Sequence, residues 1–151
     1  MNTASDCIFC QILQGKSEAS FVYRGEKVSA FMDLYPVTPG HILVIPHEHF
    51  EEFSRVDADS VGRMFQLGRS LGKALREISP DLQGISYYLA EGAAAGQVVP
   101  HAHLHVIPRQ SGDGCGLRLH KGAPHRAERA DLAERAAELH DALNAAEISS
   151  V

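Results

Sequence analysis

The chain has 151 residues, an apolar fraction of 44% and a charged fraction of 22%, values typical of one globular domain with a substantial core. A formal net charge of -5 argues against a broad contact with nucleic acid, although a small phosphate ligand needs only a local site. Neither a membrane-spanning segment nor a secretory signal is expected, and three cysteines suit no disulfide framework, so we expect a cytoplasmic protein.

The first half of the chain predicts three strands. Residues 20–33, SFVYRGEKVSAFMD, are typical of two short strands that form a hairpin around Arg24-Gly25-Glu26. LYPVTPGH, residues 34–41, is punctuated by proline and glycine and predicts a loop. The apolar run HILVIP that follows it indicates a buried central strand.

A long helix is predicted next, capped by Asp57 or Asp59 and running to about Ile78. Apolar side chains recur along it at steps of three and four residues: Val61, Met64, Phe65, Leu71, Leu75 and Ile78. Gly68 and Gly72 lie inside this helix, where each costs about 1 kcal/mol relative to alanine. We therefore expect them to mark close packing of the helix on the sheet.

The second half predicts two more strands and a second main helix. GISYYLAEG indicates a strand, EGAAAGQ a loop of small residues, and HAHLHVIP the last core strand. The segment 112–125 is irregular, and a helix is expected over about 126–146. These elements predict a single α+β domain over residues 1–151, with a mostly antiparallel five-stranded sheet.

Three histidines alternate with apolar residues in VVPHAHLHVIPR, residues 98–109. In a strand, His101, His103 and His105 would share one face, and Ala102, Leu104 and Val106 would face the core. Adjacent imidazoles repel when charged, so at least one pKa is expected to fall. A neutral imidazole suits a nucleophile or a metal ligand. The row is also consistent with an exposed polar face, or with a zinc hydrolase that uses the row directly.

Cys7 and Cys10 form a C-x-x-C pair, which is a common half of a zinc site. No second pair exists, so histidines would have to complete the site. The candidates are His47, His49, His101, His120, His125 and His140. Two buried structural thiols or a redox pair are the alternatives.

The run from His101 to Ile107 resembles the signature of the histidine triad (HIT) family of nucleotide-binding proteins and hydrolases. The resemblance includes CIFCQI, AFMDLYPVTPGHILVIPHEH and EGAAAGQVVPHAHLHVIPR, which together span roughly residues 6–109. It implies an α+β fold with a sheet that pairs across a homodimer. It also implies a purine nucleotide substrate that is attacked at the α-phosphate.

The resemblance also implies roles for individual residues. His103 would be the nucleophile that forms a nucleotidyl-histidine intermediate, assisted by His105, His41 and Gln97. Asp33 would bind the ribose, although it is also a typical turn residue before Pro36. The positions matching the base pocket are Ile8, Phe9, Ile12, Phe31, Leu34 and Leu43, each equally consistent with plain core, and Val98 would offer its backbone N–H to a phosphate oxygen. As in bacterial members, a structural zinc would be held by Cys7, Cys10, His49 and His101, and no catalytic metal is expected.

Two positions depart from the family pattern. Ala90 stands where many hydrolases of the family have asparagine, and Val98 where they have serine or threonine. We expect a hydrolase of purine nucleoside phosphoramidates or dinucleoside polyphosphates that releases a nucleoside monophosphate. A nucleotidyl transferase or phosphorylase, with an acceptor held by Arg109, Arg118, Lys121 and Arg126, and a non-enzymatic nucleotide-binding module remain open.

Overall fold

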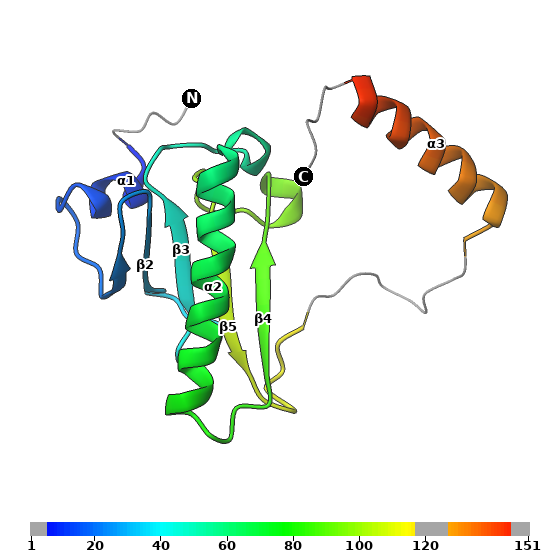
Figure 1. Cartoon of the computed structure of the whole chain (residues 1–151). Coiled ribbons are helices and arrows are strands. Elements are labelled where there is room, and N and C mark those ends of the chain that lie inside the picture. Colours follow the sequence, from blue (N-terminus) through cyan, green and yellow to red (C-terminus); the bar gives the residue numbers. More distant parts are fainter. Residues whose placement is uncertain (1–5, 117–126, 146–151) are drawn as a thin grey trace. The chain divides into compact units, whose positions relative to one another are not determined.

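The computed structural model describes residues 6–116 and 127–145. Within them lies a five-stranded sheet in the order β1-β2-β3-β5-β4, in which each strand runs antiparallel to its neighbours (Figure 1). The strands are β1 (Phe21–Arg24), β2 (Val28–Met32), β3 (Ile42–Pro46), β4 (Gly84–Leu89) and β5 (Leu104–Arg109). This arrangement confirms the predicted α+β class and the predicted sheet.

Strand β3 lies at the centre of the sheet and is buried at all five positions, which explains its unbroken apolar sequence. On one side it pairs with β2, from Val28 opposite Pro46 to Met32 opposite Ile42. On the other side it pairs with β5, where Leu43 lies opposite His105. The histidine-bearing strand is thus fixed against the most buried strand of the sheet.

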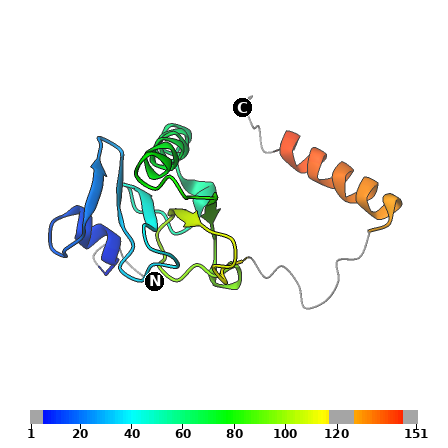
Figure 2. The ribbon, with the colours of Figure 1, turned by 90° about the horizontal axis from the view of Figure 1, so that it is seen from below.

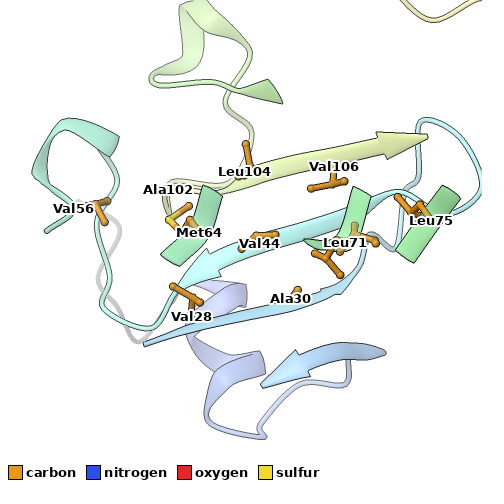
Figure 3. Close-up of a cluster of buried hydrophobic side chains, with 11 residues drawn as sticks. Val28, Ala30, Val44, Val56, Met64, Leu71, Leu75, Ala102, Leu104 and Val106 are labelled. Atoms are coloured by element: carbon orange, nitrogen blue, oxygen red, sulfur yellow. The ribbon is translucent and has the colours of Figure 1, made fainter. Parts of the chain in front are cut away.

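Helix α2 (Ala58–Ile78) covers one face of the sheet (Figures 1 and 2). Of the two predicted caps, Asp57 is the one that caps the helix, because its side chain accepts a hydrogen bond from the Ser60 N–H at 3.0 Å. The helix buries Met64, Leu71 and Leu75 against the sheet. Figure 3 shows the cluster that they form with side chains of strands β2, β3 and β5 and of the loops before α2 and β5. Ala102, Leu104 and Val106 belong to this cluster. The prediction that these three residues face the core is confirmed.

Two of the three glycines within α2, Gly68 and Gly72, do mark close packing. A Cβ atom at Gly68 would lie 3.0 Å from a methyl group of Leu104, and one at Gly72 would overlap the hydroxyl of Tyr87. Gly62, in the same helix, has no neighbouring atom within 4 Å of that position. The glycines at 68 and 72 therefore let the helix lie closer to the sheet than a side chain would permit.

We expect Gly68→Ala to be less stable than Gly62→Ala by about 1–3 kcal/mol in free energy of unfolding. Both substitutions gain about 1 kcal/mol of helix propensity, but only the methyl group at position 68 overpacks the core against Leu104. Urea unfolding of the two variants measures the difference. Equal stability of the two would contradict the close packing.

A short helix, α1 (Ile8–Leu13), covers the opposite face of the sheet (Figure 2). It was not predicted, because six residues give too little periodicity to distinguish a helix from a loop. A second buried cluster lies beneath it, made up of Cys7, Phe9, Cys10, Ile12, Phe31, Leu43 and Ile45. The C-x-x-C pair is therefore carried by the first turn of a helix on the face opposite α2.

The predicted start of the last core strand was wrong. Strand β5 begins at Leu104, so only His105 of the three alternating histidines lies within it. His101 and His103 belong to irregular backbone, where the N–H of His101 bonds to the Val99 carbonyl and the N–H of Ala102 bonds to the Phe50 carbonyl. These bonds replace strand pairing, and they separate the side chain of His101 from the other two.

Helix α3 (Arg129–Ala145) belongs to the second of two compact units, Met1–Cys115 and Gly116–Val151. It agrees with the helix predicted over 126–146, whose two end residues lie outside the described residues. Its apolar residues Leu132, Leu139 and Leu143 are exposed. The prediction of one domain over the whole chain stays a prediction. Over residues 6–116 and 127–145, no helix is both long and apolar enough to cross a membrane.

Candidate functional site

Four side chains from three separate segments meet beneath α1. The ligand atoms of Cys7, Cys10, His49 and His101 all lie within 4.8 Å of one another. Nδ1 of His101 is 3.5 Å from the sulfur of Cys7 and 3.6 Å from that of Cys10, and Nδ1 of His49 is 3.4 Å from the sulfur of Cys10. The structure thus brings together all four residues of the predicted metal set.

The geometry of this cluster fits zinc. Tetrahedral zinc, with bonds of about 2.3 Å to sulfur and about 2.0 Å to nitrogen, places sulfur and nitrogen ligands about 3.5 Å apart. Nε2 of His101 is 2.9 Å from the carbonyl oxygen of Pro46. A carbonyl only accepts, so Nε2 carries the hydrogen and the Nδ1 lone pair faces the sulfurs. Among the described residues, the buried Nε2 of His49 has no such acceptor.

Burial shifts the pKa values of two side chains of the cluster in the direction that favours their neutral forms. Burial, reinforced by the neighbouring Cys7, raises the pKa of the Cys10 thiol to about 11. Burial lowers the pKa of His101 to about 4, so that its imidazole is neutral. Zinc binds neutral imidazole and deprotonated thiol, and its charge offsets the cost of forming the buried thiolates.

One ring nitrogen of His103 is held by a hydrogen bond, and the other carries a lone pair that can react. Its Nδ1 lies 2.6 Å from the carbonyl oxygen of His101, which can only accept, so the hydrogen is on Nδ1 and the lone pair is on Nε2. The ring is 5% exposed and packs edge-on against Phe9 of α1, with ring centroids 5.2 Å apart. A neutral imidazole whose distal nitrogen has a free lone pair is a nucleophile or a base.

A chain of hydrogen bonds orients the neighbouring His105. The N–H of Val37 donates to Nδ1 of His41 at 3.1 Å, so Nε2 of the neutral His41 ring carries the hydrogen. That nitrogen lies 2.8 Å from Nδ1 of His105 and donates to it. His105 must then carry its own hydrogen on Nε2, which makes this atom a donor. His105 is next to His103, with ring centroids 4.7 Å apart.

All three of these imidazoles have a lowered pKa. Burial is the main cause for His41 and His103, and the charge of Asp33 opposes it in both cases. Burial, followed by repulsion from His103 and His41, lowers the pKa of His105 to about 4. The expectation that crowding lowers at least one pKa is met, although desolvation contributes more than repulsion.

Asp33 stands at the edge of this group. One carboxylate oxygen lies 3.4 Å from Nδ1 of His41, and the other accepts the N–H of Tyr35 at 2.8 Å. The second contact is the turn role that was the alternative to ribose binding. The carboxylate is 17% exposed, which leaves part of it accessible.

The loop over residues 92–98, here named the 92–98 loop, contains the 3-10 helix η2 (Ala93–Ala95). The side chain of Gln97 is held at both ends, accepting from the Gly92 N–H at 2.7 Å and donating to the Glu51 carbonyl at 2.8 Å. The N–H groups of residues 95–97 bond within the loop, and that of Val98 is not among them. A cleft of about 590 Å³ borders the loop and is lined by Glu51, Glu52, Glu91, Gly92, Ala93, Gln97, Val98 and Pro100.

The apolar positions predicted to bind the nucleotide fall into two groups. Phe9, Ile12, Phe31 and Leu43 are buried in the cluster beneath α1. Ile8, Leu34 and Val98 are exposed, and Val98 is 90% exposed. The first group has the core role that was its alternative, and the second presents apolar surface to solvent. Ala90, one of the two departures from the family pattern, is buried.

Arg109, a predicted acceptor-binding residue, is already paired. Its guanidinium contacts both carboxylate oxygens of Asp113, at 2.7 and 2.8 Å, and also the Ser86 hydroxyl at 3.0 Å. The other predicted cations, Arg118, Lys121 and Arg126, lie outside the described residues. The pairing with Asp113 weakens the case for a phosphate acceptor at Arg109.

Sequence reasoning missed three groups that shape the site. The Val37 N–H and the Pro46 carbonyl fix histidine tautomers, and Tyr88 packs against His105 with ring centroids 5.5 Å apart. Backbone groups have no signature in a sequence. Tyr88 is recognisable only from the register that places it opposite His105.

Together, the sheet, the histidine with a free Nε2 and the adjoining Cys/His cluster define the class of histidine triad proteins. A HIT domain model matches residues 14–112, more than half of the chain, and the chain belongs to this family. An uncharacterized HIT-like protein of Borreliella burgdorferi is 42% identical over 114 residues, covering 75% of this chain and 82% of the relative.

Two solved structures are similar over nearly the whole chain. A histidine triad nucleotide-binding protein from Candida albicans has a TM-score of 0.81 and 27% identity, covering 93% of this chain and 99% of that one. A Zn-bound histidine triad family protein from Mycobacterium smegmatis has a TM-score of 0.70 and 34% identity, with the same coverage. These similarities support a nucleotide-binding or nucleotide-hydrolysing function.

Proposed function

We infer that the protein hydrolyses purine nucleoside phosphoramidates or dinucleoside polyphosphates at the α-phosphate, through a nucleotidyl intermediate on His103. The observation that carries this proposal is the hydrogen bond between Nδ1 of His103 and the His101 carbonyl. It holds the lone pair on Nε2, so the imidazole can attack phosphorus without first losing a proton to a base.

The reaction would proceed in two displacements. Nε2 of His103 forms a P–N bond as the bond from phosphorus to the leaving group breaks, and the leaving group departs with that electron pair and takes a proton from solvent. Water then attacks phosphorus and gives up a proton to solvent, the P–N bond breaks with its electron pair returning to Nε2, and the nucleoside monophosphate is released. The Nδ1–H···O=C bond is kept throughout and stabilises the positive charge that the ring carries in the intermediate.

The neighbouring groups would serve the phosphate and the sugar. Nε2–H of His105, oriented through His41, would donate to a phosphoryl oxygen. The N–H of Val98, for which the described residues provide no backbone acceptor, would add a second donor from the 92–98 loop. The accessible oxygens of Asp33 would accept from the ribose hydroxyls. Gln97 would act near the leaving group by holding the loop, because both ends of its amide are engaged.

The base would bind on apolar surface. Ile8 and Leu34 offer exposed side chains, and Phe9, Ile12, Phe31 and Leu43 support that surface from beneath. Apolar contacts discriminate weakly between adenine and guanine, because either purine buries a similar area.

The zinc proposed for Cys7, Cys10, His49 and His101 would be structural. Four protein ligands leave it no open position for a substrate. It would cross-link α1 to the segment before β5 and would take no part in the reaction.

A homodimer is proposed through β4. Within the described part of the chain, β4 is an edge strand with no strand paired to its outer side, and it carries the exposed side chain of Tyr87. A second copy of the strand would cover both. Light scattering during size-exclusion chromatography measures the mass, and a monomer at micromolar concentration would contradict the proposal.

The test of the function is incubation with a panel of adenylated and guanylated phosphoramidates and dinucleoside polyphosphates, without added divalent metal. We expect release of the nucleoside monophosphate and, after an acid-free quench, a mass increase of one nucleotidyl group on the protein. Product that appears only when inorganic phosphate is supplied would indicate a phosphorylase. Tight binding of nucleoside monophosphate without turnover on any substrate would indicate a binding module.

A further inference from the structure

Tyr88 contacts both His105 and the loop beside it. It lies on β4 directly opposite His105 of β5, and the two rings are tilted against each other with centroids 5.5 Å apart. Its hydroxyl donates to the carbonyl oxygen of Ala95, in η2, at 2.7 Å. One side chain therefore joins the sheet position of His105 to the 92–98 loop.

The loop needs such an anchor from outside. Residues 92–96 are glycine and alanine, so they carry no polar side chain that would hold the backbone in place. Gly92 and Gly96 both have positive φ, at 82° and 91°, which glycine adopts without strain. Gln97 holds one end of the loop through its bonds to Gly92 and Glu51. Tyr88 holds the η2 turn through its hydrogen bond to the Ala95 carbonyl.

The loop also lies close against the hydroxyl. A Cβ atom at Gly96 would lie 3.6 Å from the Tyr88 oxygen, in ordinary contact. The Tyr88 ring packs against His105, and its hydroxyl contacts the turn at Ala95 and Gly96. The distance between the loop and His105 therefore depends on the length of this one side chain.

We propose that Tyr88 is a positioning residue, which sets the distance between the Val98 N–H of the 92–98 loop and Nε2 of His105 so that both reach the same α-phosphate. The inference rests on the proposed function, because it assumes that the loop and His105 bind a phosphate. Tyr88 itself touches no substrate in this scheme.

Such a residue affects phosphate binding and leaves nucleoside binding unchanged. Loss of the hydroxyl would release the loop from His105, so a ligand with an α-phosphate would have to order the loop on binding. A nucleoside without phosphate makes no contact with the loop. The ratio of the two affinities separates positioning from a general structural role.

The experiment uses Tyr88→Phe, which keeps the ring against His105 and removes only the hydroxyl. The matched control is Tyr87→Phe on the same strand, because successive strand residues point to opposite faces and the Tyr87 hydroxyl lies against Gly72 of α2. Calorimetry measures the affinity of each protein for AMP and for adenosine. Thermal unfolding and steady-state kinetics are measured on the same samples.

For Tyr88→Phe we expect AMP affinity and kcat/KM to fall by about 3- to 10-fold, the effect of one hydrogen bond, with adenosine affinity and Tm unchanged. The control should match the wild type for both ligands. The inference would be overturned if Tyr88→Phe lost AMP and adenosine affinity equally or lost neither, or if Tyr87→Phe showed the same loss. In each case the activity of the wild-type protein would still support the proposed function. A wild-type protein that binds no AMP would overturn the proposed function and the inference together.

Discussion

His103→Asn is expected to lower kcat on the best nucleotide substrate by at least about 1,000-fold and to eliminate the nucleotidyl adduct, without unfolding the protein. The lone pair on Nε2 is the attacking group, and an amide has no equivalent nucleophile. Without the covalent step, the residual rate would come only from binding and from stabilisation of charge at the phosphate.

Asparagine is preferred to alanine in this test because His103 is buried and donates to the His101 carbonyl. The asparagine NH2 group can keep that donation, whereas alanine would leave a cavity and an unpaired carbonyl. AMP binding should change by only a few fold. His140→Asn, on an exposed histidine of α3, is the control and should keep full activity. A His103→Asn variant with more than about a tenth of the wild-type kcat would contradict covalent catalysis at this residue.

Cys10→Ser is expected to abolish zinc binding and to lower the free energy of unfolding by several kcal/mol, which corresponds to a fall in Tm on the order of 10 °C. The sulfur of Cys10 is close to both ligand nitrogens, at 3.4 Å from His49 and 3.6 Å from His101. Its loss would leave only three of the four ligands, too few to close the tetrahedron around the ion.

Elemental analysis of the purified protein measures the first effect, with about one zinc per chain expected in the wild type. Urea unfolding measures the second. Cys115→Ser is the matched control, because Cys115 lies outside the cluster and is partly exposed. Wild-type protein that carries no zinc after purification in zinc-containing medium, or a Cys10→Ser variant as stable as Cys115→Ser, would contradict the structural zinc.

The loss of zinc should also affect the catalytic histidine. His101 is predicted to bind the metal through Nδ1, and its carbonyl fixes the tautomer of His103. The two sites therefore share one residue. We expect the Cys10→Ser variant to lose activity and stability together. If the zinc took part in the chemistry directly, its removal would abolish activity while the fold stayed intact.

The sequence by itself determined the class of fold and named the candidate site residues. The hairpin, the buried strand β3 and the long helix α2 each follow from local periodicity and turn residues, which act over a few residues. The metal set was predictable in the same way, because C-x-x-C limits the remaining ligands to a few histidines and the family resemblance selects two of them.

The tertiary structure alone decided how the three alternating histidines divide. Alternation predicts one shared strand face, but the bonds from Ala102 to Phe50 and from His101 to Pro46 hold that segment outside the sheet. His101 faces the cysteines as a result, and His103 and His105 face each other. These contacts join residues about 50 positions apart, and no local pattern encodes them.

The tautomers were decided at the same level. Backbone carbonyls and N–H groups are identical at every residue, so a sequence cannot indicate that the carbonyl of His101 accepts from His103 or that Val37 donates to His41. Only folding brings a particular backbone group to a particular ring nitrogen. The sequence supplies the imidazoles, and the fold decides which nitrogen of each is free to react.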